Sequence, residues 1–145
     1  MMVAIGSDHA GFKLKSELKR FLEAQSIEVL DLGCPDENPN DYPDVARELA
    51  GGVSAGRYEQ GILICGSGIG MSIAANRFPG VRAALCCDED MARLSRQHND
   101  SNILVLGARL TTAEQARRIV EKWMATGFEG GRHLRRINKI DGEQT

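Results

Sequence analysis

Short apolar runs alternate with segments of helical periodicity along the whole chain, and this alternation restricts the possible folds more than any other feature. The apolar runs have the length of β-strands and occupy residues 3–7, 27–33, 61–65, 81–87 and 103–109. The helical segments occupy residues 12–25, 45–56, 71–77, 88–98, 111–126 and 130–140. Strand followed by helix five times, with short connections, predicts a doubly wound α/β domain built on a five-stranded parallel sheet.

Local patterns support individual elements. In 12–25, Leu14, Leu18 and Leu22 share one helical face, with lysines and glutamates opposite. The run 61–65 is almost wholly apolar, as expected for a strand covered on both faces. The segment 111–126 begins with a threonine and has Glu114 three positions later, which predicts a capping box. The proline-rich segment 34–44 is expected to cap the helix at 45–56.

Size, charge and cysteine content limit the class of protein. A chain of 145 residues predicts one domain, 1–145, with a helical tail at about 129–145. A net charge of −2 argues against a nucleic-acid or membrane-surface partner. We see no signal peptide and no apolar stretch of about 20 residues. The cysteines, at 34, 65, 86 and 87, form no CxxC motif, so we expect reduced thiols and a cytoplasmic protein.

Parallel α/β sheets bind ligands at the carboxyl ends of their strands. The segments of interest are therefore 6–11, 34–44, 65–70, 87–88 and 107–109. Of these, "GSGIG" (66–70) is the most informative. A glycine turn between strand and helix lets backbone N–H groups converge on an anion or oxyanion. A tight structural turn and a dinucleotide site remain open, although the spacing is G-x-G-x-G; Asp88 would be the ribose-binding carboxylate.

Cys65 is the last residue before this glycine turn, near a helix N-terminus that favours a thiolate. From its position, a role as nucleophile or base and a purely structural role are equally open. The phosphatase motif C-x5-R is excluded because the sixth residue after Cys65 is Met71. For Cys86, within an apolar run, the structural interpretation is favoured.

Three further groups are candidates. His98 is a possible partner for Cys65, or simply a histidine at a helix C-terminus. The pair Asp8–His9 follows the first strand, where it either binds a ligand or forms an N-cap. Arg132 and Arg136, at i and i+4, form either a phosphate clamp or a solvated basic face. No metal site is expected, because the three histidines lack ligand spacing.

Taken together, five motifs are much more specific than any one alone. In order along the chain they are "SDHAGF", "DYPD", "GILICGSGIGMSIAANR", "LSRQHNDSNILVLGAR" and "GGRHLRRI". This set resembles the type B ribose-5-phosphate isomerases of the ribose/galactose isomerase family, over residues 3 to about 140. The resemblance implies a Rossmann-like three-layer α/β/α sandwich, no metal or organic cofactor, and a homodimer or homotetramer with active sites shared between subunits.

The resemblance also implies roles for individual residues. Cys65 would be the base that moves a proton between C2 and C1 through an enediolate, and His98 would assist ring opening. The backbone of 66–70 would stabilise the oxyanion. The substrate-binding residues implied are Asp8, His9, Tyr42, Gly66, Ser67, Gly68, Ile69, Gly70, Asn99, Arg109, Arg132 and Arg136.

The implied reaction interconverts ribose 5-phosphate and ribulose 5-phosphate, in the pentose phosphate pathway. One subgroup places a carboxylate base where this chain has Met71; the chain therefore fits the thiol subgroup. Cys65 and His98 together favour a self-sufficient homo-oligomer. A six-carbon substrate (allose or galactose 6-phosphate), a non-catalytic phosphosugar-binding protein and a nicotinamide-dependent enzyme remain as alternatives.

Overall fold

In the computed structural model, which describes residues 2–142, five parallel strands form one sheet in the order β2-β1-β3-β5-β4. The strands are β1 Met2–Ser7, β2 Glu28–Asp31, β3 Gly61–Cys65, β4 Ala83–Leu85 and β5 Ile103–Gly107. The helices are η1 His9–Gly11, a 3₁₀ turn, then α1 Phe12–Glu23, α2 Tyr42–Ser54, α3 Ile69–Ala75, α4 Glu89–Asn99, α5 Ala113–Ala125 and α6 Arg132–Ile140. The predicted parallel α/β fold is confirmed.

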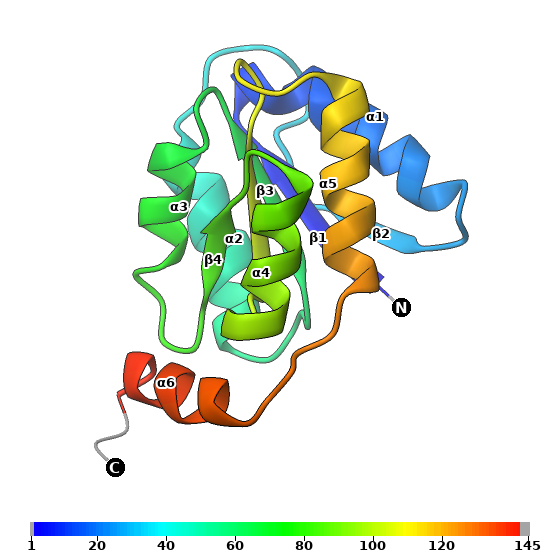
Figure 1. Cartoon of the computed structure of the whole chain (residues 1–145). Coiled ribbons are helices and arrows are strands. Elements are labelled where there is room, and N and C mark those ends of the chain that lie inside the picture. Colours follow the sequence, from blue (N-terminus) through cyan, green and yellow to red (C-terminus); the bar gives the residue numbers. More distant parts are fainter. Residues whose placement is uncertain (1, 143–145) are drawn as a thin grey trace.

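Helices cover both faces of the sheet, which gives three layers (Figure 1). Helices α1, α4 and α5 pack on one face, and α2 and α3 pack on the other. Successive residues of β3 point to alternate faces. Ile62 and Ile64 therefore join the first core, whereas Leu63 and Cys65 join the second. Cys65 consequently faces the layer formed by α2 and α3.

The chain reverses its direction of winding at the centre of the sheet. Strands β1 and β3 are neighbours, with Ser7 in register with Ile64, but β1 leads outward to β2, whereas the chain after β3 continues toward β4 and β5. The loops after β1 and β3 thus leave toward opposite faces. In doubly wound folds, ligands bind at the carboxyl ends of the strands beside such a reversal.

Several helix starts differ from the prediction by one to three residues, and two of these differences have a clear cause. Helix α2 begins at Tyr42 rather than 45, because Pro43 fits the first turn of a helix, where its missing N–H is not needed. Its N-cap, Asp41, makes no side-chain capping bond, so the expected capping by 34–44 is wrong in that respect. The capping box of α5 is one residue later than predicted. Thr112 and Gln115, rather than Thr111 and Glu114, form it.

Strand β4 is shorter than the predicted run 81–87 because it lies at the edge of the sheet. At this edge, side-chain oxygens accept the hydrogen bonds of backbone N–H groups that a neighbouring strand would otherwise pair. Asn76 Oδ1 accepts a hydrogen bond from the N–H of Ala83, and Asn102 Oδ1 accepts one from the N–H of Arg82, each at 2.8 Å. Cys86 therefore lies beyond the strand rather than within it, although it is buried as expected.

Helix α6 lies at the opposite end of the sheet from the loops that follow β1 and β3 (Figure 1). Two glycines with positive φ, Gly130 and Gly131, turn the chain into it. It packs with His133 and Ile137 inward. The predicted tail at about 129–145 contains this helix; residues 143–145, like Met1, lie outside the described residues. Over residues 2–142, no helix has the length and apolarity needed to cross a bilayer.

Candidate active site

Backbone hydrogen bonds fix the carboxyl edge around Cys65. The N–H of Asp8 donates to the carbonyl of Ile64 at 3.1 Å, which ties the loop after β1 to β3. On the other side, the N–H of Ala108 donates to the carbonyl of Cys65 at 2.8 Å, and that of Arg109 donates to Gly66 at 2.9 Å. The ends of three strands are thus held together, as the sequence predicts for residues at this edge.

Cys65 is the final residue of β3, and only 4% of its surface is exposed. The glycine loop follows at once, and α3 begins four residues later at Ile69. Within residues 2–142, the backbone N–H groups of Gly66, Ser67, Gly68 and Gly70 have no hydrogen-bond partner. A thiol therefore adjoins a short run of unpaired amide donors, the arrangement that an oxyanion requires.

The loop must be nearly bare for steric reasons. Gly68 has a φ of +79°, in the left-handed region that favours glycine. A Cβ at Gly66 would lie 2.9 Å from Nη1 of Arg109, and one at Gly70 would lie 2.5 Å from the ring of Tyr42. The side chains of Arg109 and Tyr42 therefore pack directly on the loop. The structure brings both of these predicted residues to the Cys65 side.

Ser67 has a structural role that is visible within the loop. Its Oγ accepts a hydrogen bond from the N–H of Ile69 at 3.2 Å and so caps the start of α3. The side chain of Ile69, in contrast, is 54% exposed.

Asp8 and His9 occupy the loop after β1, as predicted. Asp8 is buried, and its Oδ1 accepts a hydrogen bond from the N–H of Gly11 at 3.1 Å. Asp8 is thus the N-cap of the 3₁₀ turn η1, which is one of the two roles considered for it. His9 is held by Asn40, from the loop between β2 and α2, through a backbone hydrogen bond of 2.8 Å. No sequence pattern pointed to Asn40 beyond its place in a carboxyl-edge loop.

The remaining predicted residues lie at the other edge of the sheet. Helix α4 runs antiparallel to the strands, so His98 and Asn99 at its end lie near the strands' amino ends. The carbonyl of Asn102, just after α4, accepts a hydrogen bond from the N–H of Gly61, the first residue of β3. Because a strand rises about 3.3 Å per residue, Gly61 and Cys65 are roughly 13 Å apart. Within one chain, the structure does not bring His98 to Cys65.

A stacked pair of histidines forms the centre of this second cluster. The rings of His98 and His133 are nearly parallel, at 14°, with centroids 4.3 Å apart. Nε2 of His98 lies 3.7 Å from a carboxylate oxygen of Glu129. Burial, the charge of Arg132 and the neighbouring His98 together lower the pKa of His133. Sequence reasoning missed His133 and Glu129, although both adjoin the "GGR" motif.

These three side chains place potential metal ligands within 4.8 Å of one another. Their geometry does not suit a shared ion, however. The lone pair of an imidazole nitrogen lies in the plane of its ring, and two stacked, nearly parallel rings direct such lone pairs along parallel lines rather than toward one point.

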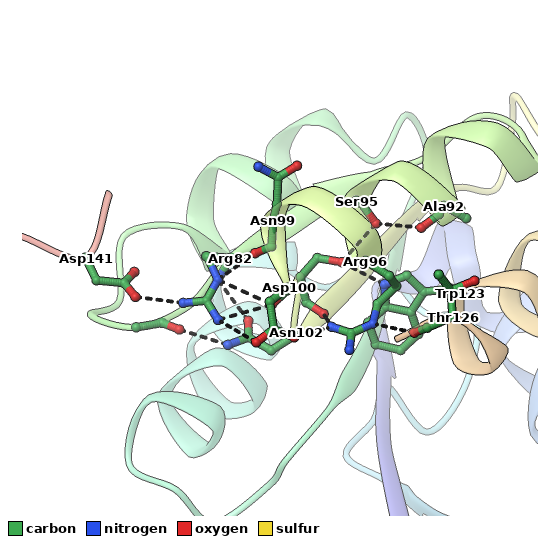
Figure 2. Close-up of polar contacts among 12 residues, drawn as sticks. Arg82, Ala92, Ser95, Arg96, Asn99, Asp100, Asn102, Trp123, Thr126 and Asp141 are labelled. Carbon is green, nitrogen blue, oxygen red and sulfur yellow. Dashed lines mark hydrogen bonds and ion pairs between the residues drawn. The ribbon is translucent and has the colours of Figure 1, made fainter. Parts of the chain in front are cut away.

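Arg132 and Arg136 lie on α6 beside this cluster, and both are exposed. They occupy one helical face as predicted. With His98 and Asn99 they form a basic surface at the end of α4. The side chain of Asn99 points away from the polar network beneath it (Figure 2).

Arg82 joins the ends of α4 and α6. Its Nε donates to the carbonyl of Asn99 at 2.8 Å, and its Nη1 donates to the carboxylate of Asp141 at 2.8 Å (Figure 2). The Arg82 side chain is 15% exposed and that of Asp141 is 30% exposed, so the ion pair is only partly shielded from water. Arg82 therefore sets the position of the helix that carries Arg132 and Arg136. A groove of about 530 Å³ adjoins it, lined in part by Asn99 and Ile140 but not by Cys65.

Two residues discussed in the sequence analysis, Asp88 and Cys86, have structural explanations. Oδ1 of Asp88 accepts a hydrogen bond from the N–H of Met91 at 2.7 Å. This carboxylate therefore caps α4, which explains its position without a ribose-binding role. Burial raises the pKa of the Cys86 thiol to about 11, which leaves it protonated near neutral pH. Cys34 is also buried, whereas Cys87 is exposed.

Comparison with known proteins places the chain in a family. Residues 3–140 match the family model described as Ribose/Galactose Isomerase. Ribose-5-phosphate isomerase B of Escherichia coli is 46% identical over 138 residues, which cover 95% of this chain and 93% of that protein. D-erythrulose-4-phosphate isomerase of Pectobacterium atrosepticum is 39% identical over 142 residues, which cover 97% and 93%.

Solved structures of similar proteins support the same family assignment. A ribose 5-phosphate isomerase from Thermotoga maritima superposes with a TM-score of 0.95 at 52% identity, covering 98% of each chain. Ribose-5-phosphate isomerase B from Mycoplasma genitalium, solved with bound ribulose-5-phosphate, has a TM-score of 0.93 at 42% identity, covering 97% and 93%. With a match over nearly its whole length, a shared fold and a cysteine beside an amide-lined loop, the chain belongs to the ribose/galactose isomerase family and is an aldose–ketose isomerase.

Proposed function

We propose that this protein interconverts D-ribose 5-phosphate and D-ribulose 5-phosphate, with residues 1–145 forming one domain. The names of its relatives from Escherichia coli and Thermotoga maritima support this substrate, as does the ribulose-5-phosphate bound to the Mycoplasma genitalium enzyme. The observation that carries the proposal is the position of Cys65, directly before four unpaired backbone N–H groups.

In the proposed reaction the Cys65 thiolate removes the proton from C2 of the open-chain aldose. The electrons of that C–H bond form the C1–C2 double bond, and the C1 carbonyl oxygen becomes an enediolate oxygen. The unpaired N–H groups of Gly66, Ser67, Gly68 and Gly70 stabilise this charge, and removing one such donor typically lowers the rate by about 10²–10³. The thiol then returns the proton to C1. The C2 hydroxyl gives up its proton and the enediolate oxygen on C1 takes one up, so that the C2–O bond becomes the carbonyl of the ketose and C1 becomes a hydroxymethyl group. No cofactor takes part.

The other residues bind the substrate and prepare it. His98 donates or accepts the proton needed to open the sugar ring, with Asn99 beside it. Arg132 and Arg136 hold the phosphate, since guanidinium groups offer paired donors to its oxygens. Asp8, His9, Tyr42 and Arg109 line the sugar end.

We further propose that two copies of the chain complete each site, as a homodimer or a tetramer of two such dimers. Two observations support this. The Cys65 and His98 groups lie at opposite edges of one sheet. Large apolar side chains are exposed beside both groups: Ile69 and Leu110 near Cys65, and Leu134 and Ile140 on α6. Burying such side chains against a second copy is favourable.

Substrate length is the main alternative. The Pectobacterium atrosepticum relative is named for a four-carbon sugar phosphate, so a tetrose phosphate is the second candidate. A six-carbon sugar phosphate would require a deeper pocket at the same groups.

A panel of tetrose, pentose and hexose phosphates, incubated in deuterated water, tests these assignments. We expect ribose 5-phosphate to give the highest kcat/KM, with solvent deuterium incorporated at C1 of ribulose 5-phosphate. A higher kcat/KM for a tetrose or hexose phosphate would reassign the substrate. Binding without deuterium incorporation from any member would instead identify a phosphosugar-binding protein.

A further inference from the structure

The contact between Asn40 and His9 determines which nitrogen of the His9 ring carries a proton. The two residues are 31 positions apart, and both are half-buried at the carboxyl edge. The N–H of His9 donates to Oδ1 of Asn40 at 2.8 Å, and the N–H of Asn40 donates to Nδ1 of His9 at 3.2 Å. Asn40 therefore contacts both the backbone and the ring of His9.

The second of these hydrogen bonds fixes the chemistry of the ring. A backbone N–H is only a donor, so Nδ1 must offer its lone pair and cannot carry a proton while this bond persists. The alternative contact, from Nδ1 to Oδ1 of Asn40, is longer at 3.4 Å, and that oxygen already accepts the hydrogen bond from the His9 backbone. In the neutral ring the proton then resides on Nε2.

The location of His9 gives this tautomer a use. His9 begins the turn η1, and the preceding residue, Asp8, is tied by its N–H to Ile64 of β3, next to Cys65. Nε2 lies on the side of the ring away from Nδ1, and hence away from Asn40. A ring held in this way offers an N–H donor and no acceptor on its side away from Asn40.

We propose that Asn40 is a positioning residue that holds His9 as its Nε2–H tautomer, so that His9 donates a hydrogen bond to an oxygen of the bound sugar phosphate. The identity of the ligand in this inference rests on the proposed function. The tautomer of His9 does not depend on it. It assigns a task to the loop between β2 and α2, whose residues outside "DYPD" have no other role in the site.

The ring can be observed directly in the protein without ligand. Nitrogen-15 NMR of histidine-labelled protein, at a pH where the ring is neutral, distinguishes a protonated from an unprotonated ring nitrogen; the missing signal in His9→Ala assigns the residue. We expect a proton on Nε2 and none on Nδ1. A proton on Nδ1 would overturn the proposal, whether or not the protein turns over ribose 5-phosphate.

Kinetics test the consequence for the substrate. Asn40→Ala keeps the backbone N–H that donates to Nδ1 but removes Oδ1, which holds that backbone against His9. The ring of His9 should then be held less firmly, so KM for ribose 5-phosphate should rise about fivefold while kcat stays within about twofold, as expected for one weakened hydrogen bond. Asn38→Ala, in the same loop with an exposed side chain, is the matched control and should change neither constant. In a His9→Ala background, Asn40→Ala should have no further effect, because its role acts through His9. Full additivity of the two substitutions would contradict the proposal.

Discussion

The carboxyl edge of the sheet carries most of the predicted site residues and the amino edge carries four, and the two edges are constructed differently. At the carboxyl edge, strand ends and a glycine loop are tied by backbone hydrogen bonds, and Cys65 is buried between packed layers. At the amino edge, side chains from the ends of two helices meet through a histidine stack and the Arg82–Asp141 ion pair. Backbone pairing thus orders the first region, whereas a few side-chain contacts order the second.

This difference suggests why the proposed proton transfer is assigned to the carboxyl edge, and phosphate binding and ring opening to the amino edge. A proton transfer and its oxyanion require donors that do not move during the reaction, which the strand ends supply. Phosphate binding and ring opening tolerate a less rigid surface, which in the proposed homodimer a second copy would complete. Each of the following predictions tests one side of this comparison or the connection between the two.

The largest effect is expected at the carboxyl edge. Cys65→Ala should lower kcat for ribose 5-phosphate by about 10³-fold or more, since it removes the proposed base, while substrate affinity stays within about tenfold. Stopped-time activity assays would measure kcat, and calorimetric titration would measure the substrate affinity. Cys87→Ala, at an exposed cysteine, is the control and should retain full activity. Near-full activity of the Cys65→Ala variant would show that Cys65 is not the base that transfers the proton.

The connection between the edges can be tested by mixing variants. Cys65→Ala and His98→Asn should each be nearly inactive alone. Refolded together in equal amounts, they should recover about a quarter of wild-type activity, because half of the dimers then contain one intact shared site. Each variant refolded alone is the control. If activity does not return in the mixture, the two groups are not shared between copies.

The smallest effect concerns the stability of the second region. Burial and the charge of Arg132 lower the pKa of His133, so its neutral form is favoured in the folded protein. The unfolded chain then binds more protons just below the ordinary histidine pKa of about 6.5. Stability from this residue is complete above that pH and is lost as the pH falls through the lowered pKa.

Denaturant unfolding at pH 7.5 and 5.0 measures this loss. The wild type should lose more free energy of unfolding between the two pH values than His133→Asn, which has no ring to titrate. Equal losses in the two proteins would show that His133 does not carry this part of the pH dependence. The comparison also isolates the amino edge, because His133 packs there and not beside Cys65.

Much of the carboxyl edge could be predicted because it depends on local sequence. An apolar run from 61 to 65 followed by alternating glycines is a strand and a tight turn in almost any α/β context, and β3 has the predicted bounds. Helix starts were less predictable. Thr111 and Thr112 both have a suitable residue three positions later, and local sequence does not decide between them.

Sequence alone thus determined the parallel α/β fold, the buried thiol and the bare loop beside it, because each follows from periodicity or from the steric freedom of glycine. The tertiary structure decided which residues meet. It placed His98 on His133, Asn40 on His9 and the end of α4 at the edge remote from Cys65. These contacts join residues far apart in the chain, and they depend on the path that each helix takes back across the sheet, which no local pattern encodes.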